Sequence, residues 1–324
     1  MSMIEVENLR KSYNGFEAVS GVSLSVGEGE TFGFIGPNGA GKTTTINILC
    51  SLLSPTSGRA SVNGHDCVKD PYGVRSSIGL VFQEVTLDNE LTAHENLKFH
   101  CYLYGMERRL TEKRIEEILE VVGLSGRRND FVKNFSGGMK RRLEIARGLL
   151  HRPKVLFLDE PTLGLDPQTR RSVWNFIAEL KKREGNTIFM TTHYLDEAEV
   201  CDRIAIIDNG VIIACDSPAG LKSALKGDTI YLNTEDDAAA EIELRERFSV
   251  EPKHISSGGI AFMVEGAESF IPRLLSGLKT GVKSVNLKKP SLDDVFLHLT
   301  GRDVRDAGGM EAGAREGRKP KNRH

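Results

Sequence analysis

Residues 36–43 read Gly36-Pro37-Asn38-Gly39-Ala40-Gly41-Lys42-Thr43, between an apolar run at Thr31–Ile35 and a helix-like run at Thr44–Leu49. This spacing matches the glycine-rich phosphate loop that joins a strand to a helix. Glycines let backbone amides approach phosphates closely, and the N-terminus of the following helix adds partial positive charge. The sequence therefore predicts a nucleotide-phosphate site from Gly36 to Thr44. We expect Lys42 to reach the β- and γ-phosphates and Thr43 to ligate Mg²⁺.

Two adjacent acids follow a second apolar run. Val155–Leu158 leads into Asp159 and Glu160, at the carboxyl end of a predicted buried strand, where ligands of open α/β sheets bind. In isolation this would be an ordinary acidic start of a loop. Beside an intact phosphate loop, we expect Asp159 to hold Mg²⁺ and Glu160 to act as general base toward the attacking water.

A third motif, Ser136-Gly137-Gly138, precedes a predicted helix whose buried face contains Leu143, Ala146 and Leu150. Ser136 is a good N-cap, and taken alone the motif would be only a capped helix start. A capped helix start with bare amides is also an anion site. One bound nucleotide seldom needs two such sites from one chain, so the pattern indicates two chains that share the nucleotide. Lys140, Arg141, Arg142 and Arg147 are expected outside the buried face.

Short β-rich runs alternate with amphipathic stretches between Ile4 and Asp216, as in a sheet covered by helices. The alternation predicts an α/β phosphate-loop nucleoside-triphosphatase fold with a mixed sheet and a helical insertion at about residues 84–150. Asp208-Asn209-Gly210 predicts a hairpin, and Thr92-Ala93-His94-Glu95 predicts a capping box. The predicted strands are Thr31–Ile35, Ile78–Phe82, Val155–Leu158, Thr187–Met190 and Arg203–Ile207.

Two further segments follow the first predicted domain, which we place at residues 1–226. Residues 227–301 lack the phosphate-binding motifs, and their runs suggest a small α+β domain of the split β-α-β kind. Residues 302–324 have almost no apolar side chains and are expected to be a disordered tail.

Composition narrows the function classes. The chain has 43 basic and 45 acidic residues and a formal net charge of -2, so no global field attracts nucleic acid or anionic lipid. No run approaches the length of a membrane span, and the first residues lack the features of a signal peptide. We therefore expect a cytoplasmic location, with membrane association only through a partner. The five widely spaced cysteines are expected to be reduced and mostly buried.

Together these motifs resemble the nucleotide-binding subunit of ATP-binding cassette (ABC) transporters. The resemblance implies that Ser136, Gly137 and Gly138 of one subunit bind the γ-phosphate of ATP held by the other subunit's phosphate loop. Met139 stands where the family has a glutamine, and Phe135 where it has a leucine.

The same resemblance implies roles for four further residues. Tyr13 would stack on adenine, although alone it could equally be a strand tyrosine. Gln83 would reach Mg²⁺ and the water, and it would lead into the segment that faces a membrane partner. Asp166, which also caps a helix that opens at Pro167, would lie in a loop that crosses the dimer interface. His193 would contact the γ-phosphate.

Three stretches, Gly79–Glu84, Leu91–Leu97 and Pro290–Leu297, resemble the daunorubicin-resistance type of exporter ATPase. That type is a homodimer that binds Mg²⁺ and ATP, pairs with a separate membrane permease, and exports drugs, lipids or other amphiphiles. We expect such a transport ATPase at the cytoplasmic face of the membrane, with no nucleic-acid partner. The alternative is a soluble cassette ATPase that acts on nucleic acid or ribosomes without transport. A GTPase or kinase would leave the Ser-Gly-Gly motif and His193 unexplained.

Overall fold

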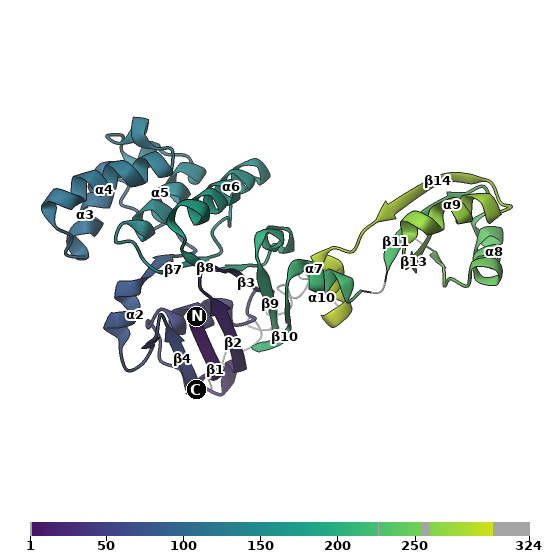
Figure 1. Cartoon of the computed structure of the whole chain (residues 1–324), viewed down its shortest axis with the longest axis horizontal. Helices are drawn as coiled ribbons and strands as arrows, with labels where there is room; N and C mark the ends of the chain where they lie inside the picture. Colours follow the sequence, from purple (N-terminus) through teal and green to yellow (C-terminus); the bar gives the residue numbers. More distant parts are fainter. Residues whose placement is uncertain (1, 226, 255–258, 301–324) are drawn as a thin grey trace, which may run out of the picture. The chain divides into compact units, whose positions relative to one another are not determined.

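The computed structural model describes residues 2–225, 227–254 and 259–300 (Figure 1). The chain divides into two compact units, Met1–Ser217 and the described residues from Pro218 onward. The division falls ahead of the expected boundary at 226/227, because helix α7 (Pro218–Ser223) contacts helix α10 (Leu292–Thr300) of the second unit. The expected tail, residues 302–324, lies outside the described residues.

The centre of the first unit is a six-stranded sheet in the order β10-β9-β3-β8-β7-β6. All neighbouring strands are parallel except β9 and β10, so the sheet is mixed, and the predicted α/β class is confirmed. Asn209 and Gly210 join β9 to β10 with φ of 47° and 77°, which confirms the predicted hairpin. The strands are β3 (Thr31–Ile35), β6 (Ile78–Val81), β7 (Val155–Asp159), β8 (Thr187–Thr192), β9 (Arg203–Asp208) and β10 (Val211–Asp216), and they confirm the five predicted runs.

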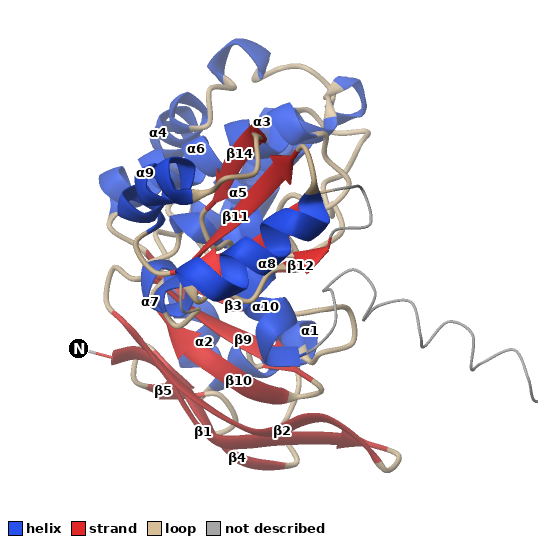
Figure 2. Ribbon diagram, turned by 90° about the vertical axis from the view of Figure 1, so that its right-hand side faces the viewer, coloured by secondary structure: helices blue, strands red, loops and turns tan. Residues whose placement is uncertain are grey.

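A second, antiparallel sheet was not singled out from the sequence. Its strands lie in the order β2-β1-β4-β5 and pack near β9 and β10 (Figure 2). Register shifts along β1 and β2 interrupt the regular alternation of buried and exposed residues, which removes the usual signal of a strand. The strands are β1 (Ser2–Tyr13), β2 (Phe16–Gly27), β4 (Ser57–Val62) and β5 (His65–Asp66).

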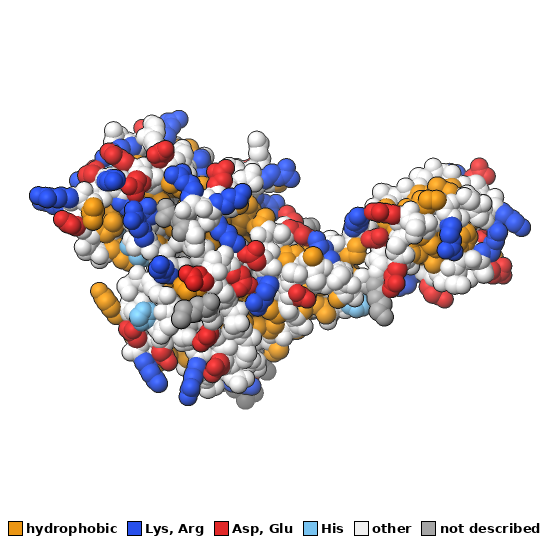
Figure 3. Space-filling view, viewed as in Figure 1, with side chains coloured by type: hydrophobic (Ala, Val, Ile, Leu, Met, Phe, Trp, Pro, Cys, Tyr) orange, Lys and Arg blue, Asp and Glu red, His pale blue; other side chains and the backbone are white. Residues whose placement is uncertain are grey.

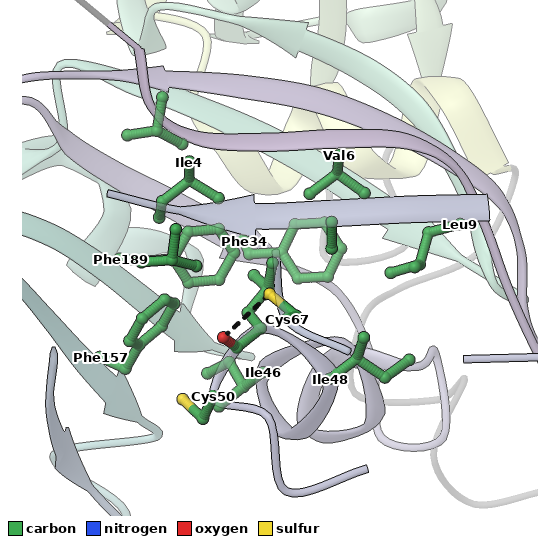
Figure 4. Packing of buried hydrophobic residues seen from close by; sticks show 14 of the residues in the cluster. Ile4, Val6, Leu9, Phe34, Ile46, Ile48, Cys50, Cys67, Phe157 and Phe189 are labelled. Carbon is green, nitrogen blue, oxygen red and sulfur yellow. Dashed lines mark hydrogen bonds between the residues drawn. The ribbon is translucent and has the colours of Figure 1, made fainter. Parts of the chain in front are cut away.

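The hydrophobic core of this unit joins both sheets to helix α1 (Lys42–Leu49). Phe189 of β8 is fully buried, and its ring centroid lies 5.6 Å from those of Phe32 and Phe34 and 5.5 Å from that of Phe157. Figure 4 shows the rings of Phe34, Phe157 and Phe189 on the side of the sheet that faces Ile46 of α1. The phosphate loop therefore lies between a rigid strand and a helix that is anchored in the core.

The stretch between β6 and β7 is mainly helical. The capping box at Thr92 and Glu95 is confirmed, and the predicted apolar face of α4, from Ile115 to Val122, is buried. Basic and acidic side chains are interspersed over these helices in Figure 3. The helices of this unit beyond α1 are α2 (Pro71–Ser77), α3 (Ala93–Leu103), α4 (Arg108–Val121), α5 (Gly137–Leu149) and α6 (Pro167–Glu184), with 3-10 turns at Ser125–Arg127, Val132–Asn134 and Leu195–Val200.

The second unit has its own four-stranded antiparallel sheet, in the order β12-β13-β11-β14. Strand β13 lies between β11 and β12, which α8 connects, so the predicted split β-α-β arrangement is confirmed. Ile230, Leu232 and Phe262 of the sheet share a core with Leu244 of α8 and Leu274 of α9. The elements are β11 (Asp228–Thr234), α8 (Asp237–Phe248), β12 (Lys253–His254), β13 (Ile260–Val264), α9 (Ala267–Gly277) and β14 (Val282–Lys288).

Two further findings concern the cysteines and the helices. All five cysteines are unpaired, and all but Cys215 are buried, as expected. Among the described residues, no helix is both long enough and apolar enough to cross a bilayer.

Candidate functional site

The phosphate loop turns tightly between β3 and α1. A side chain at position 36 would place its Cβ 2.1 Å from the carbonyl oxygen of Ile207, so only glycine fits there. Gly41 has a φ of 103°, which L-residues rarely adopt, and its carbonyl accepts from Thr45 as α1 begins. The loop thus takes the compact form that presents backbone amides at the start of α1.

Lys42 is held inside this loop. Its ammonium donates to the carbonyls of Gly36 at 2.8 Å and Pro37 at 3.1 Å, and its Nζ lies 3.2 Å from Oε1 of Glu160. Only 5% of Lys42 is exposed, and this burial lowers the pKa of the ammonium despite the nearby acids. The structure therefore brings together two residues that are far apart in sequence and were both predicted for the site.

Asp159 ends β7 next to the loop. Its Oδ1 accepts from the hydroxyl of Thr191 at 2.6 Å and from that of Thr43 at 3.4 Å. Burial raises the pKa of Asp159 more than these hydrogen bonds lower it. A carboxylate beside a hydroxyl is a set of oxygen donors of the kind Mg²⁺ prefers when phosphates and water complete its shell. These residues therefore fit the expected metal.

Glu160 lies between Lys42 and His193, which were both predicted for the site. Its Oε1 pairs with Lys42, and its Oε2 is hydrogen-bonded to Nδ1 of His193 at 2.9 Å. Burial would raise the pKa of Glu160, but the hydrogen bond with His193 and the charge of Lys42 together lower it. The carboxylate is therefore held ionised, as a general base must be. The backbone of Glu160 has a φ of 45°, which is unusual for a residue other than glycine.

Threonines near the site, which were not predicted, bond buried acids: Thr191 of β8 bonds Asp159 and Glu160, and two others bond Glu197. The hydroxyl of Thr191 donates to Asp159, and it accepts from the backbone amide of Glu160 at 3.0 Å. Thr192 donates to the buried Glu197 at 2.9 Å, and Thr162 donates to the same carboxylate. The run of hydroxyl residues before His193 was the available signal.

The Ser136-Gly137-Gly138 motif opens α5 as predicted. Ser136 is exposed and is the N-cap, and its Oγ accepts from the amide of Met139 at 3.3 Å. Gly137 is exposed, whereas Gly138 is buried against Thr169 of α6. Among the described residues, no hydrogen bond or ion pair joins this motif to the phosphate loop of its own chain.

Three residues predicted from the resemblance lie on the surface. Tyr13 ends β1 with 43% of its surface exposed, and Gln83 is exposed two residues beyond β6. Asp166 is exposed and caps α6, with its Oδ1 accepting from the amides of Gln168 and Thr169. The cap is confirmed, and the three ligand roles stay predictions.

The expectation for two arginines of α5 was wrong. Arg141 is 3% exposed and Arg147 is 7% exposed, although both were placed outside the buried face. Arg141 is buried because backbone carbonyls and the carboxylate of Glu144 satisfy its guanidinium. Glu144 itself is fully buried and also lies 3.5 Å from Arg147.

A groove of about 1000 Å³ lies between the helices α3–α5 and the segment from α2 to β6. Phe82, which follows β6 and precedes Gln83, is among its lining residues. Several of its apolar side chains are exposed to solvent, among them Leu52, Tyr72, Phe82, Leu103 and Leu110. His151 and Tyr104 both line the groove, and their rings stack with centroids 3.9 Å apart.

Comparison with known families gives matches to both parts of the chain. A family described as ABC transporter matches residues 19–163, and one described as the C-terminal domain of DrrA1-3-like ATP-binding proteins matches residues 217–300. A family of AAA domains matches residues 132–195.

Curated relatives span nearly the whole chain. The chain is 39% identical to the linearmycin resistance ATP-binding protein LnrL of Bacillus subtilis, over 94% of this chain and 100% of that protein. It is 39% identical to the daunorubicin/doxorubicin resistance ATP-binding protein DrrA of Streptomyces peucetius, over 97% of each chain. A Nod factor export ATP-binding protein of Burkholderia orbicola is 38% identical over 94% of this chain and 98% of that protein.

Solved structures agree with these relatives. The cbiO1 subunit of the cbiONQ ABC transporter complex from Clostridium perfringens superposes with a TM-score of 0.65 and 27% identity, covering 76% of this chain and 97% of that one. A dimeric ATP-binding cassette in a post-hydrolysis state, bound to ADP and Pi, gives a TM-score of 0.60 and 28% identity, covering 66% and 98%.

Proposed function

The chain belongs to the ATP-binding subunits of ABC transporters, of the drug-resistance export type, and is an ATPase; from this we propose that two copies enclose two Mg-ATP and drive a separate membrane permease. In each site the phosphate loop comes from one copy and Ser136, Gly137 and Gly138 come from the other. The observation that carries the proposal is the placement of Glu160 between Lys42 and His193.

The residues of the phosphate loop, Gly36 to Thr44, would bind the phosphates of ATP, with Lys42 on the β- and γ-phosphates. Thr43 and Asp159 are adjacent and would hold Mg²⁺, with Gln83 as a further ligand. Bound Mg²⁺ would neutralise charge on the phosphates. Tyr13 is exposed and would stack on the adenine.

Glu160 would accept a proton from the attacking water, and His193 would orient that carboxylate and contact the γ-phosphate. A lowered pKa keeps Glu160 ionised for this task. The motif of the other copy would add helix-terminus amides to the γ-phosphate, since Ser136 and Gly137 are exposed. Asp166, exposed at the start of α6, would lie at the interface of the two copies.

The groove beside Gln83 supports a permease partner. Exposed apolar side chains that gather in a concave surface are typical of a protein-binding site. A permease segment in this groove would place the protein at the cytoplasmic face of the membrane. The relatives are named for drug resistance and for export, so we propose drugs, lipids or other amphiphiles as cargo. These names lend no support to the soluble alternative.

The Glu160→Gln variant tests the shared site. Removing the base should lower hydrolysis by about 10²–10⁴-fold while the phosphate loop still binds ATP. The variant should therefore sediment as a dimer with Mg-ATP and as a monomer with Mg-ADP. Glu116→Gln, at an exposed position on α4, is the control and should hydrolyse ATP normally. A variant that stays monomeric with saturating Mg-ATP would contradict the sandwich.

The permease is tested separately by purification of the tagged chain from detergent-solubilised membranes. A multi-spanning protein should copurify in amounts comparable to the chain. Tyr72→Asp, which places a charge in the groove, should abolish that association without changing ATP binding. Recovery of ribosomes or RNA in place of a membrane protein would favour the soluble alternative.

A further inference from the structure

Arg141, in the second turn of α5, holds the backbone that carries the two acids of the site. Its guanidinium donates to the carbonyl of Glu160 at 2.9 Å and to that of Asp159 at 3.3 Å. It also donates to the carbonyls of Pro161 and, at 2.6 Å, Phe82. Five N–H donors in a rigid fork suit a site where several carbonyls converge.

The backbone at Glu160 needs such support. Strand β7 ends at Asp159, so the carbonyls that follow lie beyond its parallel ladder. Glu160 adopts a left-handed conformation, with a φ of 45°, that persists only where its surroundings enforce it. Thr191 fixes its amide from one side, and Arg141 fixes its carbonyl from the other.

Glu144 completes the arrangement one turn further along α5. Its carboxylate is fully buried and lies 3.0 Å from the guanidinium of Arg141. It also accepts from the amide and the hydroxyl of Thr86, at 2.7 Å and 3.1 Å. The segment that carries Gln83 is therefore tied to the same helix from both ends, at Phe82 and at Thr86.

We propose that Arg141 is a positioning residue for Glu160 and that it links the two ATP sites of the dimer. Ser136 at the start of α5 faces ATP held mainly by the other copy, whereas Arg141 on the same helix holds the general base of its own site. Contact of α5 with the ATP of the other copy would thereby set the position of Glu160 beside the ATP of its own copy. The first half of this proposal stands on contacts within one chain, and the second half rests on the shared-site function proposed above.

Two substitutions of Arg141 test the first half. Arg141→Gln should lower kcat by about 10²-fold, the effect of misplacing a reacting group by about 1 Å, with the Kd for a fluorescent ATP analogue unchanged. Arg141→Lys keeps the charge but loses the fork, and it should recover part of kcat. Arg142→Gln is the matched control, since Arg142 is the next residue and its guanidinium donates to the carbonyl of Val122. Wild-type kcat in both Arg141 variants would overturn the proposal.

A double-mutant cycle separates positioning from general loss of stability. If Arg141 acts through Glu160, then Arg141→Gln should not lower the residual turnover of Glu160→Gln any further. An equal loss of kcat in both backgrounds would show that Arg141 does not act through Glu160. The melting temperatures of the variants show whether each is folded. If Arg141→Gln is not folded, Arg141→Lys takes its place in the cycle.

The link between sites is tested by the dependence of hydrolysis on ATP concentration. Wild-type enzyme should give a Hill coefficient above one, and Arg141→Lys should give a coefficient near one. A coefficient that Arg141→Lys leaves unchanged would overturn the link. Failure of the shared-site function would give a different result, a Glu160→Gln variant that never dimerises with Mg-ATP. The double-mutant cycle would then still test the positioning of Glu160 by Arg141.

Discussion

The ammonium of Lys42 lies 3.2 Å from the carboxylate of Glu160, and both side chains are less than one-tenth exposed. Lys42, which we propose binds the phosphates, is thus paired with Glu160, which we propose accepts a proton from the water. A bound γ-phosphate would compete with Glu160 for this ammonium. We infer that ATP frees the Glu160 carboxylate at the moment when a base is needed, because an ammonium has three donors and a phosphate offers a stronger set of acceptors.

Removal of the other partner of Glu160 has a distinct effect. His193→Ala deletes the 2.9 Å hydrogen bond to Oε2, so the carboxylate loses its orientation but keeps its charge pair with Lys42. We expect kcat to fall by about 10²-fold with ATP affinity nearly unchanged. Steady-state hydrolysis together with equilibrium binding of ATP measures both quantities. Tyr194→Phe is the control, and a weaker ATP affinity without loss of kcat would contradict the assignment.

Asp166 combines two roles that substitutions can separate. Asp166→Ala removes the cap of α6 and should lower the free energy of unfolding by about 1 kcal/mol. Asp166→Asn keeps a capping oxygen and should retain most of that stability. If the carboxylate is needed at the dimer interface, both variants should lose hydrolysis. Urea denaturation and an ATPase assay test this pair, and full activity in Asp166→Asn would leave Asp166 with the cap alone.

The aromatic cluster beneath the site predicts a large loss of stability. Phe189→Ala should cost about 3–5 kcal/mol, because it removes the fully buried ring that contacts Phe32, Phe34 and Phe157. Phe189→Leu keeps an apolar side chain in β8 and should cost much less. Chemical denaturation of both variants gives the comparison. Equal losses would show that the ring contacts, and not the apolar volume alone, provide the stabilisation.

Much of this fold could be predicted because its signals are local. The capping box at Thr92, the hairpin at Asn209-Gly210 and the cap at Asp166 each depend on residues close in sequence. The phosphate loop and the acids at Asp159 and Glu160 are equally compact motifs. Such patterns determine backbone geometry directly, so strands and helix starts were found within a few residues.

Contacts between distant segments could not be predicted in the same way. Arg141 and Glu144 appear as ordinary surface charges of a helix, since arginine and glutamate are seldom fully buried. The burial of Arg141 depends on carbonyls at the ends of β6 and β7, which only the fold brings to α5. The burial of Glu144 depends on Arg141 and on the amide and hydroxyl of Thr86. Thr191 likewise became part of the site through the pairing of β8 with β7.

One acid in the helical part of the first unit predicts a dependence of stability on pH. The hydrogen bond with His94, together with that of Lys98, lowers the pKa of Glu112 to about 2. A lowered pKa means that this acid stabilises the fold above its unfolded pKa, near 4.5, and that the contribution is lost as pH falls toward 2. Because Glu112 is 45% exposed, solvent screening limits its contribution to about 1 kcal/mol or less.

Glu112→Gln tests this dependence. Its midpoint of urea denaturation should lie below that of the wild type at neutral pH, and the difference should shrink as pH falls below 4.5. Glu116→Gln, which removes the charge pair with Arg128 at a more exposed position, should show a smaller difference at every pH. A difference for Glu112→Gln that is constant with pH would mean that the side chain acts through packing and not through its charge.

Ser136 allows the cap of α5 to be separated from phosphate binding across the dimer. Aspartate is as good an N-cap as serine, so Ser136→Asp should keep the melting temperature close to that of the wild type. Its carboxylate would repel a γ-phosphate that approaches from the other copy, whereas the neutral cap in Ser136→Asn would not. In the Glu160→Gln background, we therefore expect Ser136→Asp to bind ATP as a monomer and Ser136→Asn to retain a dimer in sedimentation with Mg-ATP. A stable dimer with Ser136→Asp would show that the start of α5 does not face the partner's nucleotide, and that Ser136 serves only its own helix.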